Sequence, residues 1–358
     1  MTVTTMTWAS NTTTSANEDK RAMAGSTLLF LRSYDEAKSA FGVILFLLSA
    51  LIILGIIVNA FICYVMLRKQ RYQRNGSNFF ILHLSLTELV YRFLVFPVII
   101  WLTVPSSTMT TVQCKTISVF SHTFSSAIFP SLVAIAMDRY QNIIHPLETL
   151  KSKRKPIFFV WLIWLYAAIA SCPFSACVKS IPIVEIPEAR GMSCNDECIG
   201  RKICDIDRAL PGQMATTLYF LIAFAIPVAT IVILYTKVAI FLRQRSRNGM
   251  MNKVAARSKA KAVRMLIITV TGYVLSLGPA VVLSMLRSYG IFNNTPFGVM
   301  LLVSWSAEFA SYASSLGNPL IYAYYNADFR KEIIRLICKR TNKKEVSNDV
   351  SMVNVSQH

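Results

Sequence analysis

The chain has 358 residues, of which 54% are hydrophobic and only 15% are charged, a composition that argues against a soluble enzyme. Its apolar residues form long blocks, each able to cross an apolar layer of about 30 Å. The formal net charge is +19, but the basic residues crowd particular connections between the blocks. Their placement indicates membrane topology and contact with anionic membrane lipids, and we expect no binding to nucleic acid.

The chain begins with residues 1–41, a Thr- and Ser-rich stretch that we expect to be an extracellular disordered tail. Residues 42–67 then contain no charged side chain and are long enough to span a bilayer. Six more apolar blocks follow, at 78–103, 114–137, 157–178, 214–242, 262–288 and 298–325. The sequence therefore predicts an all-α membrane protein, with a seven-transmembrane helix bundle over residues 42–325.

Two short segments follow the seventh span. Residues 326–340 place apolar side chains on one helical stripe and basic ones on the other, which predicts an amphipathic cytoplasmic helix on the membrane surface. Cys338 near its end is a candidate for palmitoylation, with a free thiol as the alternative. Residues 341–358 form an expected disordered cytoplasmic tail whose hydroxyl side chains are candidate sites for a receptor kinase and for arrestin.

Lys and Arg are concentrated in the connections after the first, third and fifth spans. By the positive-inside rule, this predicts an extracellular N-terminus and a cytoplasmic C-terminus, in a multi-pass protein of the plasma membrane. Asn11 and Asn293 begin glycosylation sequons on the predicted outer side.

Several short motifs fall in one order along the seven spans. The third span ends in Asp138-Arg139-Tyr140, and the seventh contains Asn318-Pro319 with Tyr322 three residues later. Single polar, aromatic or proline residues mark the other spans: Asn59, Trp164, Pro173, Pro227, Tyr235 and Pro279. Over roughly residues 40 to 340 the chain resembles the rhodopsin-like (class A) family of G-protein-coupled receptors, and most resembles its peptide-binding members.

The resemblance implies a role for the inner ends of the helices. Asp138 can hold Arg139 by a charge-assisted hydrogen bond. In the active form, Tyr235 and Tyr322 would pack near Arg139, and a helix of a heterotrimeric G protein would enter the cleft. Lys259 stands where some members carry an acid that locks the arginine, so high basal activity is a hypothesis.

The prolines and the sixth helix carry further expectations. Pro227, Pro279 and Pro319 each remove a backbone hydrogen bond and permit a kink, although each can also merely shape its helix. Leu277 replaces the aromatic side chain that usually lies beneath the ligand, and Tyr273 replaces the usual Phe one turn inward. The family's account of sixth-helix movement therefore does not carry over intact.

The resemblance also implies a disulfide between the third helix and the second outer loop. Cys114 matches the family's cysteine in the third helix, and Cys204 fits the usual spacing to the fifth-helix proline better than Cys198 or Cys194. A second pair is expected among Cys177, Cys194 and Cys198, and its connectivity stays open.

The second span carries two charges at membrane depth, Glu88 and Arg92. The resemblance places Glu88 in a central polar site that can hold a sodium ion, whose residues here are Asn59, Glu88, Arg92, Ser314, Ser315 and Asn318. A Glu for the usual Asp, and Ile128 for the usual serine, argue against sodium. Because Arg92 follows Glu88 at i+4, an internal ion pair is one reading. A Glu88 that couples to the seventh helix and changes protonation is the other.

The outer half holds the candidate ligand contacts: Ser121, His122, Arg287, Glu308 and Tyr312. In the resembled family, Ser121 argues against an amine ligand and Tyr312 against a retinal Schiff base. Glu308 can accept a cationic group and Arg287 an anionic one, unless Glu308 instead pairs with Arg92 or Arg287. A neuropeptide or other peptide is the first expectation. A lipid or small metabolite, or a constitutively active orphan, is the alternative.

Other classes of protein fit the sequence less well. A seven-helix transporter or channel predicts inverted repeats or several acids along one pathway, and neither is apparent. An enzyme predicts a metal-ligand cluster, a nucleophile elbow or a phosphate loop, and none is apparent. We therefore expect no enzymatic activity and no cofactor other than the doubtful sodium ion.

Overall fold

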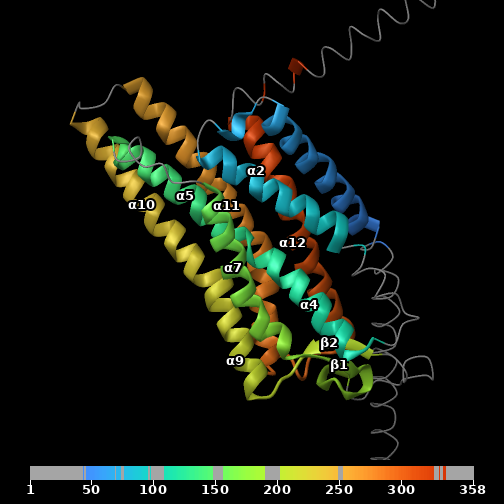
Figure 1. Cartoon of the computed structure of the whole chain (residues 1–358). Helices are drawn as coiled ribbons and strands as arrows, with labels where there is room; N and C mark the ends of the chain where they lie inside the picture. Colours follow the sequence, from blue (N-terminus) through green and yellow to red (C-terminus); the bar gives the residue numbers. More distant parts are fainter. Residues whose placement is uncertain are drawn as a thin grey trace, which may run out of the picture.

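A computed structural model describes residues 43, 46–68, 70–73, 76–95, 97, 109–147, 156–189, 202–248, 253–325, 330 and 334–335. In this part of the chain, seven helical rods lie side by side in one elongated bundle (Figure 1). The predicted seven-helix architecture is therefore confirmed. The sequons at Asn11, the thiol of Cys338, both terminal tails and most of the 326–340 segment lie outside the described residues.

The bounds of the rods follow the apolar blocks, with extensions beyond them. The first rod is Phe46–Arg68, and it is followed by a short helix, η1, Arg71–Gln73. The second rod consists of α2, Gly76–Val90, and the π-helical turn η2, Tyr91–Val95. The remaining rods are α4 Thr111–Ser126 with α5 Ile128–Ile144; α7 Pro156–Ala176; α9 Leu210–Tyr219, the π-helical turn η5 Phe220–Ala225 and α10 Ile226–Arg247; α11 Lys253–Ser288; and α12 Phe297–Tyr325.

Within the described residues, five of the rods are long and apolar enough to cross a membrane: Phe46–Arg68, Thr111–Ile144, Pro156–Ala176, Leu210–Arg247 and Arg257–Ser288. Large apolar side chains such as Phe46 and Trp161 are more than 70% exposed on the outside of the bundle. Exposed apolar side chains are expected on a surface that lipid chains cover. The helical backbone suits the same surroundings, because its hydrogen bonds are satisfied within each helix. The two other rods, α2 with η2 and α12, hold Glu88, Arg92 and Glu308, which are described below.

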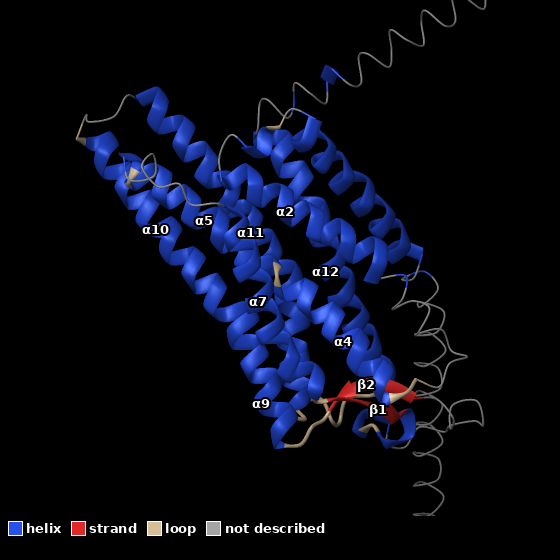
Figure 2. Ribbon diagram, viewed as in Figure 1, coloured by secondary structure: helices blue, strands red, loops and turns tan. Residues whose placement is uncertain are grey.

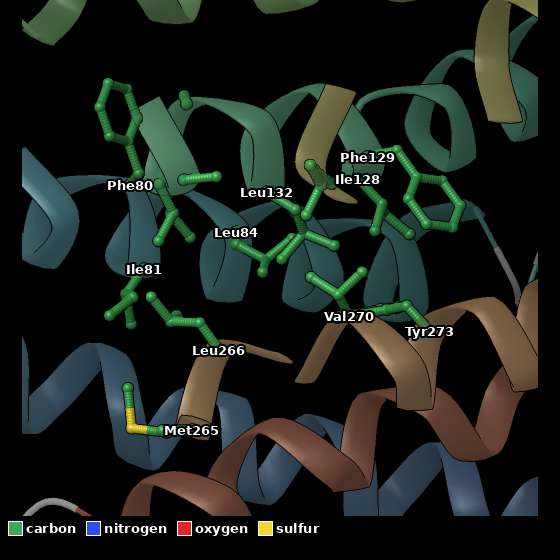
Figure 3. Packing of buried hydrophobic residues seen from close by; sticks show 14 of the residues in the cluster. Phe80, Ile81, Leu84, Ile128, Phe129, Leu132, Met265, Leu266, Val270 and Tyr273 are labelled. Carbon is green, nitrogen blue, oxygen red and sulfur yellow. The ribbon is translucent and has the colours of Figure 1, made fainter. Parts of the chain in front are cut away.

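The core is packed between α2, α5 and α11. Figure 3 shows Leu84 of α2 and Leu132 of α5 close to Val270 of α11, all of them buried. Tyr273 lies at the same level, and its ring centroid is 6.5 Å from that of Phe129. These side chains recur on one face of each helix. Their close packing against one another fixes the helices in one arrangement.

The π-helical turn η5 ends two residues before Pro227. The N–H of Ile226 donates to the carbonyl of Leu221, five residues back, in place of the usual four. Proline cannot donate a backbone hydrogen bond, and a local change in the helical repeat accommodates that loss. Pro173 and Pro279 lie inside α7 and α11, and α12 continues as a helix through Pro319.

A β-hairpin covers one end of the bundle, where Figure 2 shows the two strands. Strand β1, Val178–Pro182, pairs antiparallel with β2, Lys202–Ile206, so that Ser180 lies opposite Cys204. Two short helices, η3 Ile183–Glu185 and η4 Pro187–Ala189, follow β1. The disulfide Cys114–Cys204 joins β2 to α4, as predicted.

The same region also limits which cysteines can form the expected second disulfide. Cys177, which immediately precedes β1, has a free thiol. The expected pairs that include Cys177 are therefore wrong, and of the three possibilities only Cys194 with Cys198 remains. Both of these residues lie outside the described ranges.

Candidate functional site

A cavity of about 160 Å³ opens at the hairpin end of the bundle. It is bounded by α11, α12 and strand β2, and its lining residues are Asp205, Ile206, Ala280, Leu283, Ser284, Arg287, Ser304, Ala307 and Glu308. Two of the candidate ligand contacts, Arg287 and Glu308, are thus brought together at one cavity. The volume suits a single side chain or terminal group, because pockets for whole drug-sized molecules are about 300–1,000 Å³.

The carboxylate of Glu308 is available inside this cavity. No hydrogen bond or ion pair joins it to any residue in the described ranges, and its side chain is exposed to the cavity space. The alternative in which Glu308 pairs with Arg92 or Arg287 is wrong, because both arginines have other carboxylate partners. Glu308 is therefore a carboxyl group at the cavity wall with no ion-pair partner among the described residues.

Arg287 belongs to a cluster of two arginines and two carboxylates, which we call the outer charge network: Glu188, Asp205, Arg208 and Arg287. Arg287 Nη2 lies 3.3 Å from Asp205 Oδ2, and its Nε lies 3.9 Å from Glu188 Oε1. Arg208 Nη2 donates to Glu188 at 2.9 Å and to Asp205 at 3.2 Å. The network ties the hairpin to α11, and Arg287, which was expected to accept an anionic group of a ligand, lies beside two carboxylates of the protein itself.

Arg208 also connects the network to the loop between α11 and α12. Its Nη1 donates to Asn293 Oδ1 at 2.8 Å. Asn293, the predicted outer glycosylation site, is exposed in this loop. Nearby, Lys179 donates to Asp207 Oδ2 at 2.6 Å. That hydrogen bond, helped by one from the Ala209 N–H, lowers the pKa of the Asp207 carboxyl from its usual range.

The other candidate ligand contacts lie deeper and outside the cavity lining. Tyr312 is stacked on Tyr91, with ring centroids 6.4 Å apart, and the Tyr91 hydroxyl lies 3.2 Å from Ser121 Oγ. The His122 ring packs 4.3 Å from the Phe174 ring, and its Nδ1 lies 2.9 Å from the Ser118 carbonyl oxygen. These residues form a partly polar, aromatic layer beneath the cavity.

The charges of the second span form the internal ion pair that was one of the two readings of the sequence. Arg92 Nη2 lies 3.0 Å from Glu88 Oε2, and both side chains are only 2% exposed. Tyr273 of α11 donates to Glu88 Oε1 at 3.1 Å. Arg92 also donates to the Tyr312 carbonyl at 3.2 Å, and its guanidinium lies over the Tyr312 ring. We call Glu88 with Arg92 the core ion pair; it joins α2 to α11 and α12.

The other described members of the central polar site bond mainly to carbonyls of their own helices. Asn59 Nδ2 donates to the Gly55 carbonyl at 2.9 Å and lies 3.5 Å from the Ser315 carbonyl. Ser314 and Ser315 donate to carbonyls of their own helix, at 2.6 Å and 3.2 Å. Asn318 lies in α12, but its side chain is outside the described part of the structure.

At the opposite end of the bundle, the structure differs from the expectation for Asp138. Its carboxylate accepts hydrogen bonds from the backbone N–H and the hydroxyl of Ser77, in the first turn of α2. A Cβ at Gly76 would collide with that carboxylate, so a glycine is needed for the close approach. Within the described ranges, no ion pair joins Asp138 to Arg139, and Arg139 Nε is buried without a hydrogen-bond partner.

The other candidates at the Arg139 end are placed only in part. Tyr235 is buried in the main core, and the Tyr140 ring packs 5.8 Å from the His145 ring. Leu277, which was expected beneath the ligand, is buried in the same core. Pro319 and Tyr322 lie on α12, and nothing is described of their side chains.

Sequence reasoning missed a buried polar contact between three helices. Trp164 Nε1 donates to His83 Nε2 at 3.1 Å, and Ser131 Oγ lies 3.2 Å from His83 Nδ1. His83 was visible as a polar residue at the edge of the charged second span, but its partners come from α5 and α7. Only the packing of those helices brings them together.

Comparison with known proteins agrees with this architecture. The family model described as 7 transmembrane receptor (rhodopsin family) matches residues 58–322. The chain is 24% identical to neuropeptide FF receptor 1 of Rattus norvegicus over 330 residues, which covers 87% of this chain and 74% of that receptor.

Two further relatives are similar over comparable lengths. Neuropeptide Y receptor type 2 of Macaca mulatta is 23% identical over 310 residues, covering 85% of this chain and 78% of that receptor. The RYamide receptor of Tribolium castaneum is 24% identical over 298 residues, covering 80% and 77%. Since the family match spans well over half of its residues, the chain belongs to the rhodopsin family of seven-transmembrane receptors.

Proposed function

We propose that this protein is a plasma-membrane receptor that binds an extracellular peptide and activates a heterotrimeric G protein. The hairpin end of the bundle would face outward and the Arg139 end inward. The basic connections at the Arg139 end support this orientation, because Lys and Arg are retained on the cytoplasmic side. The relatives named above are receptors for neuropeptide FF, neuropeptide Y and RYamide, which supports a peptide ligand.

The observation that carries the ligand proposal is the Glu308 carboxylate in the outer cavity. A carboxyl group that lines an open cavity, and that has no ion-pair partner in the described part of the chain, favours a cationic group of the ligand. A volume of about 160 Å³ suits one such group. The ligand would therefore insert one arginine, lysine or amino terminus between α11 and α12, while the rest of the peptide lies over the hairpin.

The outer charge network would hold the entrance in place during binding. It joins β2 and η4 to α11 through several short contacts, and the Cys114–Cys204 disulfide joins β2 to α4. Since less of the surface must be ordered when the ligand arrives, this preorganisation favours affinity. Ser121, His122 and Tyr312 would act below the ligand as supporting residues.

At the inner end, Arg139 would be the contact for the G protein. Because Asp138 is engaged by Ser77, the arginine is not held by the acid beside it. This arrangement supports the hypothesis of high basal activity, together with Lys259 in place of an acid. Arrestin and a receptor kinase would act on the cytoplasmic tail.

The test is a signalling screen in cells that express the full-length chain with a promiscuous G-protein reporter. Pools of peptides are applied, and each active peptide is compared with its analogue in which citrulline, a neutral isostere, replaces arginine. We expect Glu308→Gln to weaken the arginine peptide about 10- to 100-fold, the usual cost of losing a charge-assisted hydrogen bond. The citrulline analogue should be weak on the wild type and little changed by Glu308→Gln.

The matched control is Glu185→Gln, which neutralises an exposed carboxylate on η3 of the same outer surface. It should leave peptide potency unchanged. Arg139→Ala, at equal surface expression, should abolish the response and lower basal signalling. A peptide response that is equal in wild type and Glu308→Gln would refute the role of Glu308, and a response that survives Arg139→Ala would refute the coupling role.

A lipid ligand is the second candidate, favoured by a groove of about 520 Å³ between α11 and α12. Its lining is almost wholly apolar and includes Pro279, Val282, Leu286, Leu302, Val303 and Ala310. A receptor that is silent to peptides but responds to lipids, and loses that response in Leu302→Trp, would favour this function. Silence to both, with basal signalling above the Arg139→Ala level, would favour a constitutively active orphan.

A further inference from the structure

The core ion pair occupies the place in which the family resemblance expects a sodium ion, so the fit of such an ion can be tested against the residues present. Sodium needs several oxygen ligands around an accessible carboxylate. Here Glu88 Oε2 is 3.0 Å from the Arg92 guanidinium, and Glu88 Oε1 accepts the Tyr273 hydroxyl at 3.1 Å. Both carboxylate oxygens therefore already have a donor.

The space around Glu88 is also filled by Arg92. A Cβ added at Gly55 of the first rod would lie 3.0 Å from Arg92 Nε and 3.1 Å from its Cδ. The arginine therefore packs directly against a glycine backbone, and Arg92 is among the largest fully buried side chains of the protein. On the side of α5, Ile128 supplies a buried apolar group close to Phe129 and Tyr273, as Figure 3 shows.

The polar atoms of Arg92 that remain unsatisfied have the wrong character for a metal ion. Arg92 Nε and Nη1 are buried and have no acceptor within the described ranges. They are N–H donors on a positive group, so they attract water or carbonyl oxygen and repel a cation. Among the described residues, the buried acceptor that lacks a hydrogen-bond partner is Asn59 Oδ1, a single amide oxygen. This donor set does not fit sodium.

We propose that the Arg92 guanidinium is the resident cation of the receptor core and replaces a bound sodium ion. A cation attached to α2 cannot leave or exchange with the cell's sodium. Folding and signalling of this receptor are therefore independent of the sodium concentration. The signalling half of this statement rests on the proposed receptor function, whereas the binding half concerns the folded protein alone.

The contacts of Arg92 also place this cation between the ligand cavity and the core. It donates to the carbonyl of Tyr312, which lies one helical turn from Glu308 on α12. On its other side, Glu88 reaches Tyr273 of α11. A displacement of α12 or α11 relative to α2 must alter at least one of these hydrogen bonds. Such a displacement can take place without any ion binding or leaving.

The first test needs no ligand and no G protein. The full-length protein is purified in lipid nanodiscs, and its thermal unfolding midpoint is measured in sodium chloride and in equal concentrations of potassium and choline chloride. We expect the same midpoint in the three salts. A midpoint that is several degrees higher in sodium alone would overturn the proposal, because only a specific sodium site distinguishes these cations.

Variants at position 92 provide the matched comparison. Arg92→Lys keeps a tethered cation and should remain insensitive to the choice of salt. Arg92→Leu combined with Ile128→Ser removes the cation and supplies a hydroxyl, and its midpoint should rise in sodium relative to potassium. If this double variant folds and is as insensitive as the wild type, Arg92 is not what excludes the ion, and the proposal fails.

The signalling half is tested separately on membranes, by nucleotide exchange on a co-expressed G protein in sodium and in potassium buffers. Basal exchange should be equal in the two for the wild type. Higher exchange in potassium, with a salt-independent unfolding midpoint, would overturn only the signalling half. Absence of any exchange, with the expected unfolding results, would count against the proposed receptor function and leave the resident cation intact.

Discussion

The outer charge network and the core ion pair both join helices through arginine and carboxylate, but they do so under different conditions. In the outer network, Arg208 and Arg287 are 18% and 23% exposed and share two carboxylates. In the core, Glu88 and Arg92 are each 2% exposed and have one ionic partner each within the described residues. Because the outer charges share partners and are partly hydrated, the loss of one of them leaves the others still neutralised. In the core, each buried charge is neutralised by the other, so the loss of one leaves the other without its ionic partner.

The largest expected effect is the loss of one member of the core ion pair. Arg92→Leu or Glu88→Gln should each destabilise the protein by about 3–5 kcal/mol, because the remaining group is buried without its partner. The double variant Glu88→Gln/Arg92→Leu should cost less than the sum of the two. Unfolding midpoints and surface expression of all four proteins measure this coupling. Strict additivity would mean that the two charges do not depend on each other.

A smaller effect is expected when the outer charge network loses a charge. Arg287→Gln should cost about 1–2 kcal/mol, between the values for exposed and buried pairs, because Asp205 and Glu188 retain Arg208. The loss should appear as faster hydrogen exchange of the β1–β2 amides. Lys202→Gln, an exposed residue of β2, is the matched control and should leave exchange unchanged. Unaltered exchange in Arg287→Gln would show that the disulfide alone holds the hairpin.

The smallest effect concerns the pair between Lys179 and Asp207, which extends the comparison to side chains that are 54% and 28% exposed. The pKa of Asp207 is lowered in the folded protein. Its contribution is therefore present above the unfolded pKa, near pH 4, and is lost as the pH falls through the folded pKa. Asp207→Asn should lower stability by less than about 1 kcal/mol at neutral pH. A difference from the wild type that persists at strongly acidic pH would contradict this assignment.

Several features could be predicted because they depend on short-range sequence relations. The i+4 spacing of Glu88 and Arg92 predicted their pairing, since residues four apart face the same side of a helix. The family spacing predicted Cys114–Cys204. The same kind of reasoning was wrong for Asp138, because the expectation considered its neighbour Arg139, while the competing donor Ser77 lies on another helix.

The outer site could be predicted only in its components. Glu308 and Arg287 stood out as charges in apolar helices, and both line the cavity. Within the described residues, Arg287 is paired and Glu308 is not, and this difference depends on Asp205 and Glu188 between α7 and α9. Loop residues have no periodic pattern that fixes their neighbours, so this difference between the two charges could not be derived from the sequence.

The sequence by itself determined the number of helices, the basic connections and the presence of charges at membrane depth, because hydrophobic length and local spacing are properties of one segment. Only the tertiary structure decided which charges neutralise each other and which remain available. Those choices depend on distances between separate helices, such as the contact of Tyr273 with Glu88 or of Gly55 with Arg92. A buried charge takes whichever partner the packing brings within hydrogen-bonding distance, because leaving it unpaired costs far more than any local preference.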